Sequence, residues 1–321
     1  MRPFVTALLL ALVLVPAALG APARVAIFYY PWWGTPAADG AFQHWQQRGT
    51  RPPRDIASAF YPARGIYSSS DRVVLGAQMA EIRAAGVRQV ISSWWGRGSP
   101  EDERLQWIAG AARAAGLELA AHLEPYGGRT PAATETDIGY LRGFGIADFY
   151  LYGAHDEPAS AWSGLNARLS GVRVFAQTGL VGFAAAGGFD GIYTYDVLVY
   201  GGGSFARICT AARRLGLVCA PSVGPGFDAR RAAGIPRVKP RRNGATYDAM
   251  WAAALRARPE RVTITSYNEW HEGTQIEPAR ARVGRNGLRY AGYDGAWGRT
   301  GAPAERAYLD RTVLWADRFT R

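Results

Sequence analysis

Short runs of β-branched and aromatic residues alternate along this chain with longer stretches whose apolar positions recur every three to four residues. The short runs have the length and composition of strands, and the longer stretches have helical periodicity. Eight such runs occur, at residues 24–31, 87–95, 117–125, 147–153, 172–179, 189–196, 217–224 and 261–270. The helices that follow them are clearest at 71–85, 100–115, 204–215, 246–258 and 304–319. The pattern therefore predicts eight consecutive strand-helix units.

Three of the predicted helices end in a glycine directly before the next strand, at Gly86, Gly116 and Gly216. Glycine adopts the left-handed backbone conformation that terminates helices without a steric penalty. Eight units in about 300 residues predict an α/β fold, a (β/α)8 TIM barrel. The main alternative is an open doubly wound sheet. That fold usually has a glycine-rich phosphate turn after its first strand, where this chain has "PWWGTP".

Residues 1–20 differ from the rest of the chain and are expected to be a signal peptide. They combine a basic start, an apolar run over 4–17 and small residues at Ala18 and Gly20. A transmembrane anchor is the alternative, but Pro16 interrupts the run, which is shorter than the roughly 20 residues that span a bilayer. We therefore expect cleavage near Gly20, a secreted or periplasmic protein without a stable membrane anchor, and a single catalytic domain over 21–321.

Composition changes this picture in two ways. The net charge of +11 invites a nucleic-acid partner, but the arginines are scattered along the predicted helices and only the segment 237–242, "RVKPRR", approaches a cluster. We therefore expect no nucleic-acid partner. The 11 tryptophans suit a pocket for an amphipathic ligand such as a sugar. The two cysteines, Cys209 and Cys219, could form a disulfide or remain two separate thiols.

The residues at the predicted carboxyl ends of the strands carry the candidate chemistry, because active sites of such barrels form there. They are mainly aromatic residues, histidines and carboxylates: Tyr30, Trp32, Trp33, Trp94, Trp95, His122, Glu124, Tyr126, Tyr193, Tyr195, Asn268, Glu269, His271 and Glu272. Side chains alternate between the two faces of a strand. If apolar Val262 and Ile264 face the helices, then Thr263, Thr265, Tyr267 and Glu269 face the barrel mouth. The same alternation turns His122, Glu124, Tyr193 and Tyr195 inward.

Two carboxylates at one rim are what the hydrolysis of a glycosidic bond requires. Glu269 and Glu272 are three residues apart, and one helical turn would bring them to the same side. Crowded carboxylates raise one another's pKa, which keeps one of them protonated as an acid. As an alternative, either glutamate could cap the following turn or pair with an arginine.

Two other arrangements compete with this pair. His122 and Glu124 could face His271 and Glu269 in a metal site, but no HExxH or paired-histidine spacing occurs, and we expect no metal or other cofactor. Glu157, after the fourth predicted strand, is a rival acid. Its companion would be Asp228, which is far along the loop after the seventh strand.

The segment 266–278, "SYNEWHEGTQIEP", resembles the signature of glycoside hydrolase family 99, the endo-α-1,2-mannosidases and endo-α-1,2-mannanases. Other segments agree in the same order along the chain, and the resemblance runs from Ala26 to the C-terminal helix. They are "FYYPWWGTPAADGAFQHW", "SSWWG", "HLEPYGGR", "GIYTYD", "PSVGPGFD" and "RRNGATYDAMWAAAL".

The resemblance implies a barrel that cleaves within chains of α-mannosides, retains anomeric configuration and uses no metal. Members of this family are thought to form a 1,2-anhydro sugar by attack of the substrate's own 2-hydroxyl. Glu269 would then be the base that removes the 2-hydroxyl proton. Glu272 would be the acid that protonates the departing oxygen and then the base that activates water. The expected partner is an α-mannoside oligo- or polysaccharide, and the protein is expected to be a monomer.

The resemblance also implies which residues bind the sugar. Residues expected to line the subsite of the reacting mannose are Trp94 or Trp95, Glu124, Tyr126 and Tyr195, with Tyr193 beside them. Residues expected at supporting or neighbouring subsites are His44, Trp45, Asn268, His271 and Arg242. Trp33 departs from the family pattern "PWYG", where a tyrosine is expected, which leaves open the sugar on the non-reducing side. The alternatives are a related glycosidase for another glycan and a non-catalytic sugar-binding barrel. Glu277 is expected to stabilise a loop.

Overall fold

The computed structural model describes residues 24–284 and 287–321, so the predicted signal peptide lies outside the described residues. Nine parallel strands form one nearly closed barrel in the spatial order β7-β6-β5-β4-β3-β2-β1-β11-β8. Their bounds are β1 (Arg24–Tyr29), β2 (Gln89–Trp94), β3 (Glu118–Leu123), β4 (Asp148–Leu151), β5 (Arg173–Gln177), β6 (Gly191–Tyr193), β7 (Val218–Ala220), β8 (Ser222–Val223) and β11 (Arg261–Ile264).

The seventh position of the barrel is one extended segment in two parts. β7 pairs with β6, whereas β8, which follows after Pro221, pairs with β11. Proline has no N–H to donate to a neighbouring strand, so the ladder is interrupted there. Nine strands therefore fill eight barrel positions, and the predicted (β/α)8 TIM barrel is confirmed.

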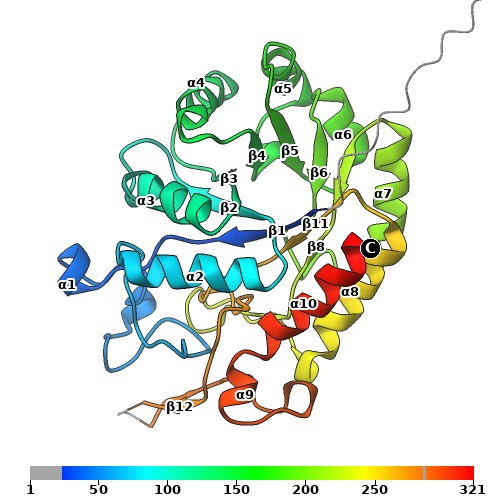
Figure 1. Cartoon of the computed structure of the whole chain (residues 1–321). Coiled ribbons are helices and arrows are strands. Elements are labelled where there is room, and N and C mark those ends of the chain that lie inside the picture. Colours follow the sequence, from blue (N-terminus) through cyan, green and yellow to red (C-terminus); the bar gives the residue numbers. More distant parts are fainter. Residues whose placement is uncertain (1–23, 285–286) are drawn as a thin grey trace, which may run out of the picture.

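Helices surround the strands, as Figure 1 shows. The main ones are α2 (Arg72–Ala84), α3 (Pro100–Ala114), α4 (Pro131–Leu141), α5 (Ala159–Asn166), α6 (Val181–Ala186), α7 (Phe205–Arg214), α8 (Ala245–Ala257) and α10 (Ala307–Thr320). Smaller elements are α1 (Pro36–Asp39), α9 (Ala302–Glu305), and the two-residue strands β9 (Phe227–Asp228), β10 (Val238–Lys239), β12 (Arg282–Val283) and β13 (Arg289–Tyr290). Five short 3-10 helices are η1 (Gln47–Gly49), η2 (Arg142–Phe144), η3 (Ala154–Asp156), η4 (Arg242–Gly244) and η5 (Ala296–Gly298).

Local sequence explains where the helices begin and end. Asp71 caps α2 by accepting the backbone N–H groups of Val73 and Val74. Gly86, Gly116 and Gly216 have φ values of 84°, 69° and 71°, so the predicted glycine stops are confirmed. The last predicted helix is two helices, because the chain leaves helical geometry between α9 and α10. None of the helices in the described part of the chain is long and apolar enough to cross a membrane.

The barrel contains two apolar layers. Val25, Ile27 and other outward residues pack beneath the helices. The interior holds a separate cluster of mainly aromatic side chains that includes Phe28, Tyr150 and Phe175. The predicted outward positions of Val262 and Ile264 and inward positions of Tyr193 and Tyr195 are confirmed. Solid packing of the interior leaves room for a ligand only at the barrel ends.

The amino-terminal end of the barrel is filled by charges that neutralise one another. Arg261 and Arg173 donate to the buried carboxylate of Asp148, and Gln89 donates to it as well. Burial tends to raise the pKa of Asp148, but these cations and hydrogen bonds outweigh it and lower the pKa. These groups therefore form a paired structural cluster at the end opposite the expected active site.

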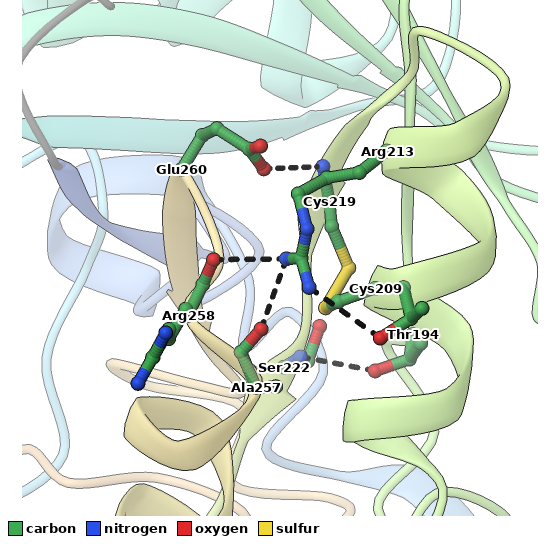
Figure 2. Close-up of a disulfide and its surroundings, with 9 residues drawn as sticks. Thr194, Cys209, Arg213, Cys219, Ser222, Ala257, Arg258 and Glu260 are labelled. Carbon is green, nitrogen blue, oxygen red and sulfur yellow. Dashed lines mark hydrogen bonds between the residues drawn. A yellow bond between two sulfur atoms is a disulfide. The ribbon is translucent and has the colours of Figure 1, made fainter.

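Cys209 of α7 and Cys219 of β7 form a disulfide, which resolves the alternative that the sequence left open (Figure 2). Residues of the connection between α8 and β11 also form hydrogen bonds around the disulfide. Arg213 donates to the carbonyl oxygens of Ala257 and Arg258, and Glu260 accepts the N–H of Cys219. The covalent link therefore reinforces the region where β7 and β8 divide.

Candidate active site

A cavity of about 260 Å³ lies at the carboxyl end of the barrel strands. Its lining consists mainly of aromatic and ionisable side chains: Tyr30, Trp32, Gln47, Trp95, His122, Glu124, Pro125, Tyr152, Tyr195, Ala233, Glu269, His271 and Glu272. Larger cavities, of about 380 and 510 Å³, include residues of the amino-terminal end of the barrel. Their Glu118 and Asp148 are already paired with arginines. Both Glu269 and Glu272 line the cavity of about 260 Å³, which makes it the candidate active site.

Glu269 is bound by the backbone of its own loop. Its carboxylate oxygens accept the N–H of His271 at 3.1 Å and the N–H of Glu272 at 2.7 Å, and the residue is 2% exposed. Burial and the nearby charge of Glu272 raise the pKa of Glu269 well above its usual range, against the lowering effect of the two N–H donors. Glu269 thus both caps a turn and faces the cavity.

Glu272 lies in the same turn and in a different environment. Tyr195 donates to Glu272 Oε2 at 3.4 Å, and the Glu272 carbonyl oxygen accepts the N–H of Asp228 at 2.7 Å. Burial and the negative charges of Asp196 and Glu124 raise the pKa of Glu272 to about 7, although the Tyr195 hydrogen bond opposes them. A carboxyl group with this pKa is able to donate a proton near neutral pH.

Tyr30 directs the hydroxyl of Tyr195. Tyr30 comes from the end of β1 and donates to the Tyr195 oxygen at 2.5 Å, so the proton of Tyr195 remains available for Glu272. Asn268 in turn holds the backbone of Tyr30. The side-chain oxygen of Asn268 accepts the N–H of Tyr30 at 2.7 Å, and the side-chain nitrogen of Asn268 donates to the carbonyl oxygen of Tyr30 at 2.9 Å. Asn268 is completely buried and thus positions a cavity residue from behind.

A third carboxylate, Glu124, faces the cavity from the end of β3. Ser93 of β2 donates to Glu124 Oε1 at 2.7 Å, and Ser93 accepts the indole N–H of Trp32 at 3.1 Å. His122 Nδ1 lies 3.0 Å from the same oxygen, and His122 Nε2 is 2.9 Å from the Tyr193 hydroxyl. The predicted inward direction of His122 and Glu124 is confirmed.

Two histidines and a tryptophan form the wall beside Glu269. The rings of Trp32 and His44 stack at 5.1 Å, and those of His44 and His271 stack at 5.6 Å. Burial lowers the pKa of His44 and of His271 to about 4, so both rings are neutral near neutral pH. His44 supports this wall but is not part of the cavity lining, whereas His271 is.

Several expected sugar-binding residues do not line the cavity. Trp95, which is 37% exposed, lines it, whereas Trp94 is buried under the helices and donates to Asp102. Tyr126 is likewise turned away and hydrogen-bonds Asp137. Tyr193 is buried below the cavity in the barrel interior.

Three other residues named in the sequence analysis also lie outside this cavity. Trp45 is completely buried and donates to the Tyr67 carbonyl. Arg242 lies at a different cavity, formed by residues that include Asp228 and Gly273. Trp33 is also completely buried, between Trp45 and His271. Trp33 is therefore not part of the cavity lining, and the sugar preferred on the non-reducing side stays open.

Alternation also fails for one residue of segment 266–278. Tyr267 was expected to face the barrel mouth, but it packs against Tyr29 and donates to Glu81 of α2. β11 ends at Ile264, and beyond it Ser266 N–H pairs with the Thr274 carbonyl of the same loop. Glu269 consequently reaches the cavity through a turn and not through continued strand alternation.

Glu277 has the stabilising role that was expected. Its buried carboxylate accepts hydrogen bonds from four side chains: Arg64, Tyr67, Gln78 and Trp270. Burial raises its pKa, although Arg64, Gln78 and Tyr67 oppose this effect. Because Arg64 and Tyr67 lie in the loop before α2 and Gln78 lies in α2, Glu277 connects the end of segment 266–278 to the outer layer of the barrel.

Some cavity residues were not among the expected sugar-binding positions. Tyr30 and Trp32 had been placed at the barrel rim, but no binding role followed from their positions. Alternation could have predicted the direction of Tyr152, since it lies two residues after the inward Tyr150. Gln47 is the first residue of η1, and no strand alternation applies to it.

The competing arrangements do not form in the cavity. Glu157 and Asp228 are absent from its lining, and Asp228 is held by Arg230 through two side-chain hydrogen bonds. Within 24–284 and 287–321, no group of three or more histidine, cysteine, aspartate or glutamate side chains could hold a metal ion. The arrangement that remains is a pair of interacting carboxylates in an aromatic cavity at the mouth of a TIM barrel, as in glycoside hydrolases.

Comparison with known proteins agrees with this class. The model of glycosyl hydrolase family 99 matches residues 22–160 and 171–321. A glycoprotein endo-α-1,2-mannosidase-like protein of Danio rerio is 32% identical over 357 residues, covering 92% of this chain and 78% of the relative. The human protein of the same name is 30% identical, with coverage of 92% and 75%.

A solved structure is similar as well. The family 99 endo-α-mannosidase of Bacteroides thetaiotaomicron, in complex with bis-tris-propane, superposes with a TM-score of 0.84 at 28% identity, covering 92% of this chain and 97% of that one. The present chain therefore belongs to glycoside hydrolase family 99. It is a glycoside hydrolase.

Proposed function

We propose that this protein is a secreted or periplasmic, retaining, endo-acting α-mannoside hydrolase. The substrate class is supported by the relatives, which are named endo-α-1,2-mannosidases or endo-α-mannosidases. The mechanism is supported above all by one observation: Glu269 and Glu272 lie in one turn at the cavity, and the pKa of Glu272 is raised to about 7.

The first step uses both carboxylates. Glu269 removes the proton of the substrate's 2-hydroxyl, whose oxygen attacks the anomeric carbon. Glu272 gives its proton to the departing glycosidic oxygen as that bond breaks. The product is a 1,2-anhydro sugar. This route suits an α-mannoside, because the axial 2-hydroxyl lies on the face opposite the leaving group.

The second step reverses the proton movements. Glu272, now a carboxylate, removes a proton from water, whose oxygen attacks the anomeric carbon. The bond from that carbon to the 2-oxygen breaks, and Glu269 returns its proton to the 2-oxygen. Two inversions at one carbon give net retention of configuration. Both glutamates end in their starting protonation states.

The test is hydrolysis of α-mannan and of a synthetic glycosyl-α-1,3-mannosyl-α-1,2-mannose by the mature protein. We expect release of the glycosyl-mannose disaccharide with retained configuration, and loss of that release in Glu272→Ala. Glu157→Gln is the matched control, because Glu157 is outside the cavity lining. Full activity in Glu269→Ala would contradict the epoxide mechanism. Binding without cleavage by the wild type would indicate a sugar-binding protein.

Export and a single domain over 21–321 are part of the proposal. They are supported by the leader-like sequence of residues 1–20 and by the disulfide, since disulfides persist in oxidising compartments. Expression of the full chain, followed by N-terminal sequencing of the exported product, tests the cleavage near Gly20. Analytical ultracentrifugation tests the proposed monomer.

A further inference from the structure

The orientation of the His271 ring determines which of its nitrogen atoms carries the proton. His271 Nε2 lies 2.8 Å from the carbonyl oxygen of His44. A carbonyl oxygen only accepts hydrogen bonds, so Nε2 must donate and must carry the hydrogen. In a neutral imidazole the other nitrogen, Nδ1, is then an acceptor. The tautomer of this ring is therefore imposed by the backbone of a different loop.

The environment keeps this orientation. His271 is 7% exposed, and the edge-on ring of Trp33 lies 4.8 Å from it. His44 presents its carbonyl from a φ of 62°, a left-handed conformation that is uncommon outside glycine. Such local strain persists when surrounding contacts hold it, and it is concentrated at functional sites.

The free acceptor lies beside the proposed base. His271 Nδ1 is 3.9 Å from Glu269 Oε1, whereas Nε2 is engaged by the His44 carbonyl oxygen. An ionised carboxylate has no hydrogen to donate, so Glu269 cannot form a hydrogen bond with an unprotonated Nδ1 in that state. The situation changes when Glu269 has taken a proton, because a carboxylic acid has an O–H group to donate.

We propose that His271 is a positioning residue whose Nδ1 accepts a hydrogen bond from the carboxyl O–H that Glu269 acquires from the substrate's 2-hydroxyl. The inference rests on the proposed function. No proton is transferred to His271: the sugar O–H bond breaks, the Glu269 O–H bond forms, and the hydrogen bond holds that proton until the 2-oxygen takes it back. The 3.9 Å separation must shorten by about 1 Å, as catalytic hydrogen bonds do in the reacting complex.

Two substitutions separate this role from a structural one. Gln in place of His271 offers an N–H near the Nε2 position but no acceptor at Nδ1, whereas Asn offers an acceptor near Nδ1 but no donor to His44. We expect His271→Gln to lower kcat about tenfold with little change in KM, since one hydrogen bond made only in the transition state is worth about this factor. We expect His271→Asn to retain more of kcat and to unfold at a lower temperature.

The opposite ranking would overturn the proposal: wild-type kcat in His271→Gln with loss of kcat in His271→Asn would show that only the bond to His44 matters. A raised KM with unchanged kcat in His271→Gln would also overturn it.

A separate readout is independent of turnover. In protein labelled with ¹⁵N-histidine, the His271 signals, assigned by their loss in His271→Gln, are expected to show a protonated Nε2 and an unprotonated Nδ1 at neutral pH. A protonated Nδ1 would refute the inference, whereas an inactive wild type with the expected tautomer would refute only the proposed function.

Discussion

The carboxylate of Glu269 accepts the backbone N–H of Glu272 at 2.7 Å. The first residue therefore fixes the backbone of the second, and the spacing of three residues becomes one rigid turn. Burial and, after it, the negative charge of Glu272 in the same turn raise the pKa of Glu269 well above its usual range. The raised pKa of Glu272 has other causes, which are burial and the negative charges of Asp196 and Glu124.

The pH profile is expected to depend on Asp196. Because Glu272 must be protonated to act as the acid and its pKa is about 7, kcat/KM is expected to fall as pH rises through about 7. Asp196→Asn removes a negative charge that raises this pKa, so the descending limb should move to lower pH. Asn keeps an oxygen that can accept the N–H groups of Leu198 and Val199. The measurement is kcat/KM against pH.

The control for that profile is Asp317→Asn, which makes the same change of net charge at α10 and away from the cavity lining. We expect it to leave the descending limb in place. A limb that stays fixed in Asp196→Asn, or that moves to higher pH, would contradict the role of Asp196.

The two adjacent tryptophans are expected to respond differently to truncation. Trp95→Ala should raise KM about 3- to 10-fold through loss of one aromatic contact with the sugar, with little change in stability, because Trp95 lines the cavity and is 37% exposed. Trp94→Ala should lower the free energy of unfolding by about 3 to 5 kcal/mol, because its ring is buried. Kinetics and urea unfolding of both variants provide the comparison, and equal effects on KM would contradict the assigned orientations.

Removal of the Glu277 carboxylate is expected to destabilise the fold. Glu277→Ala leaves Arg64 and three other donors without their acceptor, and breaking such a buried pair costs about 3 to 5 kcal/mol. The control is Glu118→Gln, because Glu118 forms an ion pair with Arg24 and its side chain is 51% exposed. This substitution should lower the free energy of unfolding by less than about 1 kcal/mol. Denaturant unfolding measures both. Similar losses in the two variants would rule out the assigned role of Glu277.

The disulfide is expected to contribute stability without affecting catalysis. Cys209→Ala/Cys219→Ala should lower the free energy of unfolding by about 2 to 3 kcal/mol, the loop-entropy value for a sequence separation of 10. Neither cysteine lines the cavity, so kcat should be unchanged. Unfolding is compared with and without a reductant, and a reductant should affect only the wild type. A large loss of kcat at full folding would show that the disulfide also shapes the site.

Sequence pattern was enough to predict the repeated strand-helix units, the glycine stops and the inward direction of His122, Glu124, Tyr193 and Tyr195. These features depend on neighbours along the chain: side-chain alternation within one strand, apolar spacing within one helix, and the conformational freedom of a single residue. The composition of segment 266–278 similarly identified it as the candidate catalytic loop.

Contacts between segments that are distant in the sequence set the remaining features. Trp95 lines the cavity whereas Trp94 does not, Tyr267 contacts Glu81 of α2, the two cysteines form a disulfide, and Arg242 lines a neighbouring cavity. The tertiary structure also brings Asp196 from the end of β6 close enough to raise the pKa of Glu272. Local pattern predicts the face of a strand on which a residue lies, but charge, burial and hydrogen bonding are set by whatever the rest of the fold places beside it.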